Sequence, residues 1–410
     1  MREATPLWTF QGSSSPSTLS ISLDGKFAGV GHKGGLTLLN QNGRPIWNNN
    51  KIRRVKDISV STKTGKMSIA SSQKVVYLVK RTGESLWHRE LQSSAVSTSI
   101  SSNGDMIVVG TSLGRLIVYD GKGKVRWEAH LSNSDFPVNT VNVSSDGQFI
   151  LAGTDYSYLY LYDRKGDILW AKETSGEVIQ TCISSNGDYV GYLTSDRTFY
   201  FGVKSSRILW EKTFDRQPVW IDMTQTADFV TVGESSSKVT LFTKEGRKVW
   251  GFRPRQAPKG VMASGGGSVF LGGKGGVCKY SLEPYLKRLL IHAQKRIEKA
   301  SSENLDTTTA KKYFTSAQSS FKAGNHLDFL VSVQQARRSA REARIIESEM
   351  TPNERRIERN EMEKATSEAS IDDSGEDELM SKLVQLAEMR ESGILSEEEF
   401  VIAKSKLLRL

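Results

Sequence analysis

Glycines at the spacing of phosphate-binding loops are the first residues of this chain that could carry out chemistry. Gly29, Gly31 and Gly34 form a Gly-x-Gly-x-x-Gly sequence, which binds a dinucleotide when it follows a strand and begins a helix. Here the run LTLL at 36–39 follows it and is typical of another strand, so we predict a turn between two strands. The run GGKG at 272–275 does not match a phosphate loop either, because Ser268 stands where the first glycine would be.

Histidines and cysteines are the next candidates, since they bind metals and act as nucleophiles. The five histidines, at positions 32, 88, 130, 292 and 326, include no pair at a ligand spacing. Cys182 and Cys278 are isolated and cannot form a disulfide framework or a four-cysteine zinc site. The sequence has no Gly-x-Ser-x-Gly elbow and no distinctive carboxylate pair. We therefore predict no catalytic, metal-binding or cofactor-binding residues, and a protein that is not an enzyme.

Composition and charge indicate the setting in which the chain works. Its 410 residues include 56 Lys and Arg against 46 Asp and Glu, a net charge of +10. Residues 1–282 contain 35 basic and 23 acidic residues, so their net charge is +12. No run approaches the roughly 18–20 apolar residues that span a bilayer, and no secretory signal is recognisable at the N-terminus. We expect a soluble cytoplasmic protein, and the basic excess favours an acidic partner.

Tryptophan marks an internal repeat, which identifies the elements of the first two thirds of the chain. Seven of the eight tryptophans are spaced by 39, 40, 40, 43, 40 and 40 residues. They are Trp8, Trp47, Trp87, Trp127, Trp170, Trp210 and Trp250. Ser-x-Asp/Asn-Gly turns precede several of them by 22–24 residues, and short β-type runs flank these turns. Each unit therefore predicts four short strands, the pattern of a β-propeller blade in which the tryptophan docks against the neighbouring blade.

Counting the units predicts how the propeller closes. Residues 9–250 hold six complete units, and residues 251–282 hold three strands without a tryptophan-bearing fourth. The N-terminal strand around Trp8 can supply that fourth strand and remove both open sheet edges. We therefore predict an all-β seven-bladed β-propeller over residues 1–282, closed by the N-terminal strand and followed by an α-helical C-terminal region.

The repeat resembles the PQQ-like (quinoprotein-type, WD40-like) propeller family, whose blades carry a Gly-Lys-x-x-Trp docking motif. Residues 123–127 (GKVRW) follow this motif closely, and residues 43–47 (GRPIW) and 166–170 (GDILW) follow it loosely. Quinoprotein enzymes of this kind have eight blades, an export signal and often an adjacent cysteine pair. Because none of these is recognisable here, the resemblance implies the fold without a quinone cofactor. A quinone-dependent or other small-ligand enzyme is the least favoured hypothesis.

The last third of the chain changes to a helical period and divides into three parts. Residues 283–365 are predicted to form a helical hairpin or bundle, and residues 366–376 a flexible acidic linker. Residues 377–410 resemble the SHOCT domain, a short C-terminal domain, through GILSEEEF at 393–400 and KSKLL at 404–408. The resemblance implies two short helices that oligomerise or dock through their apolar face, for which the candidate residues are Leu383, Leu386, Phe400, Leu407 and Leu408.

Basic side chains gather in the loops that would join successive blades. The candidate partner-binding residues are Lys51, Arg53, Arg54, Lys56, Arg216, Trp220, Arg253 and Arg255, with Lys33 and Phe136 in or beside the same loops. Our leading hypothesis is a non-catalytic cytoplasmic scaffold, in which the propeller binds a protein partner and the tail self-associates. The alternative is a nucleic-acid-associated protein that uses the basic rims for phosphate contacts and stacking. The opposite rim is also basic, which leaves the choice of face open.

Overall fold

A computed structural model describes residues 6–343, apart from short gaps at 13–15, 23, 132–134, 255–257, 265–267 and 274–275. Arg255, the linker at 366–376 and the SHOCT-like segment at 377–410 with its five apolar candidates lie outside the described residues.

Six four-stranded antiparallel sheets are each built from strands that are consecutive in sequence. The first two comprise β2(Pro16–Ile21), β3(Phe27–His32), β4(Gly35–Asn40) and β5(Pro45–Asn49), then β6(Val55–Val60), β7(Met67–Ser71), β8(Val75–Val79) and β9(Ser85–Glu90). The next two comprise β10(Ala95–Ile100), β11(Met106–Thr111), β12(Arg115–Asp120) and β13(Val125–His130), then β14(Thr140–Val143), β15(Phe149–Gly153), β16(Tyr158–Asp163) and β17(Ile168–Glu173). The last two comprise β18(Val178–Ile183), β19(Tyr189–Thr194), β20(Thr198–Val203) and β21(Ile208–Thr213), then β22(Pro218–Met223), β23(Phe229–Glu234), β24(Val239–Thr243) and β25(Lys248–Phe252).

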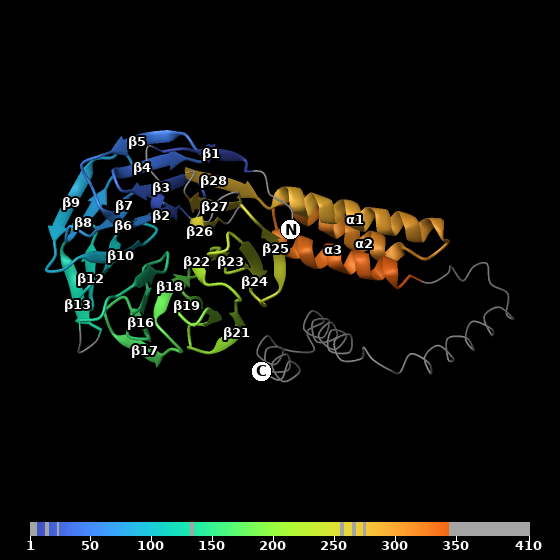
Figure 1. Cartoon of the computed structure of the whole chain (residues 1–410). Coiled ribbons are helices and arrows are strands. Elements are labelled where there is room, and N and C mark those ends of the chain that lie inside the picture. Colours follow the sequence, from blue (N-terminus) through green and yellow to red (C-terminus); the bar gives the residue numbers. More distant parts are fainter. Residues whose placement is uncertain are drawn as a thin grey trace. The chain divides into compact units, whose positions relative to one another are not determined.

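A further four-stranded sheet joins the two ends of the β-rich region. Its order is β1(Trp8–Phe10), β28(Gly276–Ser281), β27(Ser268–Gly273) and β26(Pro258–Ser264). Trp8, Thr9 and Phe10 pair with Lys279, Cys278 and Val277, respectively. The prediction that the N-terminal strand completes the last sheet is thus confirmed by the register. The sheets are arranged around a common centre as a β-propeller (Figure 1).

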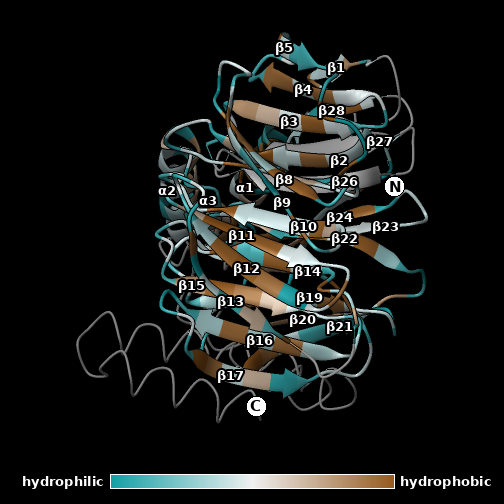
Figure 2. Ribbon diagram, turned by 90° about the vertical axis from the view of Figure 1, so that its left-hand side faces the viewer, coloured by the Kyte–Doolittle hydropathy of each residue, from teal (hydrophilic) through white to brown (hydrophobic). Residues whose placement is uncertain are grey.

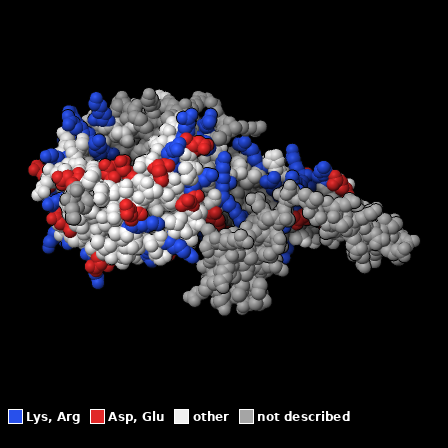
Figure 3. Space-filling view, turned by 60° about the horizontal axis from the view of Figure 1, so that its bottom comes forward, with Lys and Arg blue, Asp and Glu red and all other residues white. Residues whose placement is uncertain are grey.

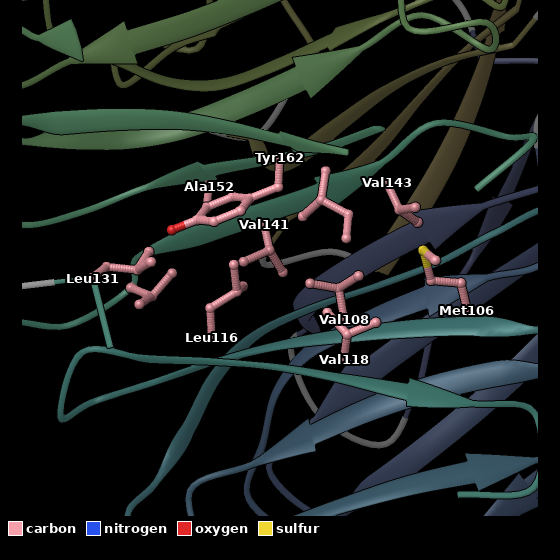
Figure 4. Close-up of a cluster of buried hydrophobic side chains, with 11 residues drawn as sticks. Met106, Val108, Leu116, Val118, Leu131, Val141, Val143, Ala152 and Tyr162 are labelled. Atoms are coloured by element: carbon pink, nitrogen blue, oxygen red, sulfur yellow. The ribbon is translucent and has the colours of Figure 1, made fainter. Parts of the chain in front are cut away.

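Burial follows the position of each strand within its sheet. All residues of the second strands β11 and β23 are buried, whereas the outermost strands β13 and β17 are mostly exposed. Apolar residues therefore concentrate in the inner three strands, which Figure 2 shows as brown segments. Neighbouring sheets pack through clusters such as the one in Figure 4, where Val108 and Leu116 of one sheet meet Val141 and Tyr162 of the next.

The repeated tryptophans connect each outermost strand to the following sheet. The indole N–H groups of six of them donate to backbone carbonyls in the third turn of the next sheet, over 2.6–3.2 Å. For Trp8, Trp47, Trp87, Trp127, Trp170 and Trp210 these acceptors are Gln41, Arg81, Gly121, Arg164, Lys204 and Lys244. Trp250 stacks on Phe252 of its own strand, with ring centroids 4.4 Å apart.

The glycine that precedes most of these tryptophans by four residues receives the indole of the preceding sheet. Gly43 has a φ of +76°, and a Cβ there would lie 2.4 Å from the ring of Trp8. Gly246 has a φ of +79°, and its Cβ would lie 2.9 Å from the ring of Trp210. Glycine is therefore needed both for the left-handed backbone and for the close approach of the ring.

Up to residue 343, where the described part of the chain ends, three helices follow the last strand: α1(Glu283–Ser302), α2(Thr308–Lys322) and α3(His326–Arg341). The Asp306 carboxylate accepts the backbone N–H of Thr308 at 2.9 Å and caps α2, which ends before Gly324 at a φ of +73°. Alanine, isoleucine and aromatic side chains pack together between the helices: Ile297, Ala310, Tyr313, Phe314, Ala336 and Ala340. No helix in the described part of the chain is long and apolar enough to cross a membrane.

Candidate binding rim of the propeller

The antiparallel strand order places two kinds of connection at one rim, which we call the loop rim. It comprises the loops from each outermost strand to the next sheet and the turns between second and third strands. In five of these connections, backbone hydrogen bonds between described residues tie the loop to the turn of the sheet that follows it. Ser72 N–H donates to the Arg54 carbonyl at 3.1 Å, and Ser195 N–H to the Glu177 carbonyl at 2.9 Å. The described loops and turns of the loop rim are therefore joined to one another by backbone hydrogen bonds.

A cluster of cations occupies the part of the loop rim formed by the first two sheets. This basic arc consists of six exposed residues: Lys33, Lys51, Arg53, Arg54, Lys56 and Lys74. None of the ion pairs in the described part of the chain includes any of the six. Their charges are thus not neutralised by a neighbouring carboxylate and are available to an acidic ligand.

The loop at 50–54 holds three of these cations on an ordered backbone. The Asn49 side chain accepts the backbone N–H groups of Lys51 at 2.9 Å and Ile52 at 3.3 Å. Ile52 is 4% exposed and anchors the loop in the core. Ser71 Oγ donates to the Arg53 carbonyl at 2.9 Å. Because the loop is ordered before any ligand arrives, little backbone entropy is lost on binding.

The other predicted binding residues do not join the basic arc. Arg216 and Arg253 are exposed in loops of the later sheets, and Arg216 follows the exposed Asp215. Trp220 was predicted to lie in or beside these loops as a candidate partner-binding residue. Trp220 belongs to β22 and is half-buried against a cluster that includes Val239 and Phe252. An inner strand of a propeller is covered by its neighbours, and this directs the indole into packing contacts.

The opposite rim also carries many cations, but several of them are paired. Lys26 lies 3.1 Å from Asp24, Lys80 lies 2.8 Å from Glu84, and Lys204 lies 3.2 Å from Asp188. Over the surface in Figure 3, Lys and Arg are interspersed with Asp and Glu. The loop rim also has ion pairs, Arg115 with Glu128 and Lys238 with Glu234, so pairing alone does not distinguish the two rims. The basic arc is distinct because its six exposed cations all come from the first two sheets and the loop between them, and none of them belongs to an ion pair of the described residues.

An aromatic stack runs from the loop rim into the seam between the β10–β13 and β14–β17 sheets. It comprises Phe136, Tyr156, Tyr158, Tyr160, Tyr162 and Trp127, each stacked on or tilted against the next. Sequence reasoning placed Phe136 near the rim but missed the tyrosines. The alternating YSYLYLY at 156–162 was the available signal, since residues two apart share one face of a strand.

Asp57 has a raised pKa and connects three inner strands. Burial raises the pKa of this carboxyl from 3.8 to about 6, although three hydrogen bonds oppose the shift. The donors are Thr98 N–H at 2.9 Å, Ile58 N–H at 2.9 Å and Thr18 Oγ1 at 3.2 Å. A raised pKa can mark a functional site, but here the donors come from β2, β6 and β10. We interpret Asp57 as a structural link between blades.

The remaining candidates for chemistry lie in strands and turns of the propeller. Gly29 and Gly31 lie in β3 and Gly34 lies in the β3–β4 turn, which confirms the predicted turn between strands. Cys182 is buried, and burial together with the nearby Asp222 raises the pKa of its thiol. Within the described residues, no three His, Cys, Asp or Glu side chains are grouped to hold a metal ion.

Comparison with known proteins supports the fold. Residues 48–198, less than half of the chain, match a family of unknown function (DUF5711). Among solved structures, the β-propeller domain of Cps50 (Swd1) from Myceliophteria thermophila is similar, with a TM-score of 0.60 and 13% identity. The similarity covers 68% of this chain and 99% of that domain. No curated protein matches. In total 1814 solved chains match, so the shared fold by itself does not select a function.

Proposed function

We propose that this chain is a non-catalytic protein-binding scaffold whose basic arc binds an acidic segment of a partner protein. The observation that carries the proposal is the group of six exposed, unpaired cations on the loop rim. Propellers commonly serve as rigid platforms for protein interaction, and the chain offers no recognised catalytic constellation. Two free cysteines fit a reducing compartment, so we place the protein in the cytoplasm.

An acidic protein segment fits the arc better than a nucleic acid does. Single-stranded nucleic acids are bound without sequence preference through cations combined with aromatic rings on which bases stack. The loop at 50–54 and the turns at 33–34 and 72–74 contain no aromatic residue. Trp220 is half-buried elsewhere, and Phe136 lies beside acidic residues. Recognition by the arc therefore depends on charge, and nucleic acid binding is the alternative that the experiment must distinguish.

Reversing the charge of the arc tests this function. Replacing Lys51, Arg53, Arg54 and Lys56 by Glu is expected to weaken binding of a labelled Glu-rich peptide about 10- to 100-fold, because four surface ion pairs each contribute roughly 0.2–1 kcal/mol. Fluorescence anisotropy at two salt concentrations measures the change. The matched control replaces four exposed lysines of the opposite rim by Glu: Lys63, Lys122, Lys124 and Lys165.

Two results would reject the proposal in its present form. An equal loss of affinity in the control variant would show that only net charge matters. Tighter binding of single-stranded RNA than of the acidic peptide, lost on reversing the arc, would establish the nucleic-acid alternative instead.

We further propose that the repeat is of the PQQ-like subtype and that residues 377–410 form a SHOCT-like tail for oligomerisation or docking. Leu383, Leu386, Phe400, Leu407 and Leu408 supply its apolar face, and two short helices bury too little surface to be stable alone. Full-length protein is expected to have a larger assembly mass by light scattering than a 1–365 truncation. Monomeric mass for both proteins would contradict self-association through the tail.

A further inference from the structure

The aromatic stack ends in exposed rings at the loop rim, in a part of the rim that is separate in sequence from the basic arc. The ring centroids of Phe136 and Tyr156 are 5.0 Å apart, with an interplanar angle of 24°. Those of Tyr156 and Tyr158 are 5.8 Å apart at 8°. Phe136 is 37% exposed and Tyr156 is 53% exposed, which is unusual for large aromatic side chains. Exposed apolar patches of this kind mark interaction sites.

The stack is fixed at its inner end, so its exposed end is held in place. Tyr162 is 2% exposed and packs against Trp127, with ring centroids 5.4 Å apart. The Tyr160 hydroxyl donates to the Leu131 carbonyl at 2.7 Å, which links β16 to the loop that carries Phe136. In the described residues, Phe136 has a ring neighbour on one side alone. The stack therefore presents an open end on which another flat group can continue.

The charges beside this open end are negative. Asp135 and Asp155 are the sequence neighbours of Phe136 and Tyr156, and Glu173 is the cross-strand partner of Tyr158. Asn139 Nδ2 donates to Asp155 Oδ1 at 3.0 Å and fixes this carboxylate beside the stack. The segments 131–139, 154–158 and 173–177 contain no Lys or Arg. This local charge is opposite to the +12 net charge of residues 1–282.

We propose that the open end of the stack binds an Arg side chain in an extended, Arg-containing segment of a partner protein. The planar guanidinium stacks on aromatic faces and pairs with carboxylates, so it matches both features of the site. A nucleobase also stacks, but its phosphates would meet Asp135, Asp155 and Glu173. This site goes beyond the function proposed above, because it does not use the basic arc and selects a ligand of the opposite charge.

The experiment uses full-length protein and a labelled peptide of alternating Gly and Arg, with matched Lys and Gln peptides. We expect the Arg peptide to bind at least about threefold more tightly than the Lys peptide, because the guanidinium also stacks. The Gln peptide is not expected to bind. Phe136→Leu keeps an apolar side chain but removes the ring face, and should weaken Arg-peptide binding about 3- to 10-fold. Phe136→Tyr keeps the ring and should retain the affinity.

A second pair of variants separates local carboxylates from net charge. Asp135→Asn combined with Glu173→Gln should weaken the Arg peptide, whereas Glu90→Gln combined with Glu211→Gln should not. Glu90 ends β9 as Glu173 ends β17, and Glu211 is also exposed on an outermost strand. Reversal of the basic arc should leave Arg-peptide binding intact, so the two proposals can fail separately.

Three outcomes would overturn the site. These are no binding of the Arg peptide, unchanged affinity in Phe136→Leu, and equal losses in the two pairs of carboxylate variants. Self-association of the full-length protein that Phe136→Leu abolishes would instead assign the exposed rings to contact with a second copy of the chain.

Discussion

A chain that begins at residue 11 is expected to melt about 10 °C or more below the full-length protein, because it lacks β1. Trp8 and Phe10 pack in the cluster that contains Leu19, Leu39 and Val277. Leu7 N–H donates to the Lys279 carbonyl at 2.7 Å, and the Trp8 indole donates to the Gln41 carbonyl at 2.9 Å. Losing two aromatic anchors and these hydrogen bonds removes on the order of 5 kcal/mol. In a domain of this size, each kcal/mol shifts Tm by roughly 2–4 °C.

The truncation also exposes β28 as an unpaired edge. An open edge of this kind pairs readily with other chains, so the shortened protein should aggregate when heated. Scanning calorimetry with light scattering follows both effects. Removing residues 1–5 alone keeps the whole of β1 and is the matched control. An unchanged melting temperature in the chain that begins at residue 11 would show that the propeller does not depend on closure by its N-terminal strand.

The strand pattern was predictable from sequence because residues typical of tight turns recur at a constant distance from the repeated tryptophans. Turn glycines such as Gly25, Gly104 and Gly147 have φ values of +69°, +72° and +70°, a conformation that few other residues tolerate. The spacing of about 40 residues then fixes the unit length. Closure was predictable as well. The last unit has three strands in sequence, and the N-terminal strand around Trp8 has no unit of its own, so the two together form a four-stranded sheet.

The individual partners in contacts between blades were not predictable in the same way, because only the closed ring brings these residues together. The repeat predicted that each tryptophan docks against the neighbouring blade, but it did not identify the residues that receive the ring. In the structure Gly43 receives Trp8 and Trp47 reaches the Arg81 carbonyl in the next sheet. Asp57 is a second example, since its donors Thr18 and Thr98 belong to the two neighbouring sheets. Such partners depend on the tertiary arrangement and have no local signature.

The contacts of the residues at the loop rim were likewise not predictable from the sequence. The sequence identified Lys51, Arg53 and Arg54 as basic loop residues, but ion pairs on the opposite rim, such as Lys80 with Glu84, became visible only in three dimensions. Trp220 was predicted to lie in or beside a loop, and in the structure it is the third residue of β22(Pro218–Met223), half-buried against Val239 and Phe252. A shift of a few residues in a predicted strand boundary is enough to convert a packed residue into an apparent surface one.

Trp210→Ala is expected to be the most destabilising single substitution among the tryptophan contacts, at about 3–5 kcal/mol. Its indole lies 5.3 Å from Phe201, 5.3 Å from Phe199 and 5.8 Å from Phe242 between ring centroids. The indole N–H also donates to the Lys244 carbonyl at 2.8 Å. Truncation leaves a cavity among three aromatic rings and a carbonyl without its donor. Urea unfolding, followed by circular dichroism, measures the loss.

Two further variants separate the aromatic packing of Trp210 from its hydrogen bond. Trp210→Phe keeps a ring against Phe201 but removes the indole N–H donor. The lost hydrogen bond should lower the free energy of unfolding by about 1 kcal/mol, in addition to the loss caused by the smaller contact area of the ring. Trp47→Ala removes an indole that makes the equivalent 2.7 Å hydrogen bond to Arg81 but has no ring neighbour in the described residues. Trp47→Ala should therefore lower the free energy of unfolding by about 1–3 kcal/mol less than Trp210→Ala does, because each aromatic pair contributes roughly 0.5–1.5 kcal/mol. Equal losses in Trp47→Ala and Trp210→Ala would mean that the shared contact with the glycine turn, and not the cluster of phenylalanines, determines how strongly neighbouring blades hold together.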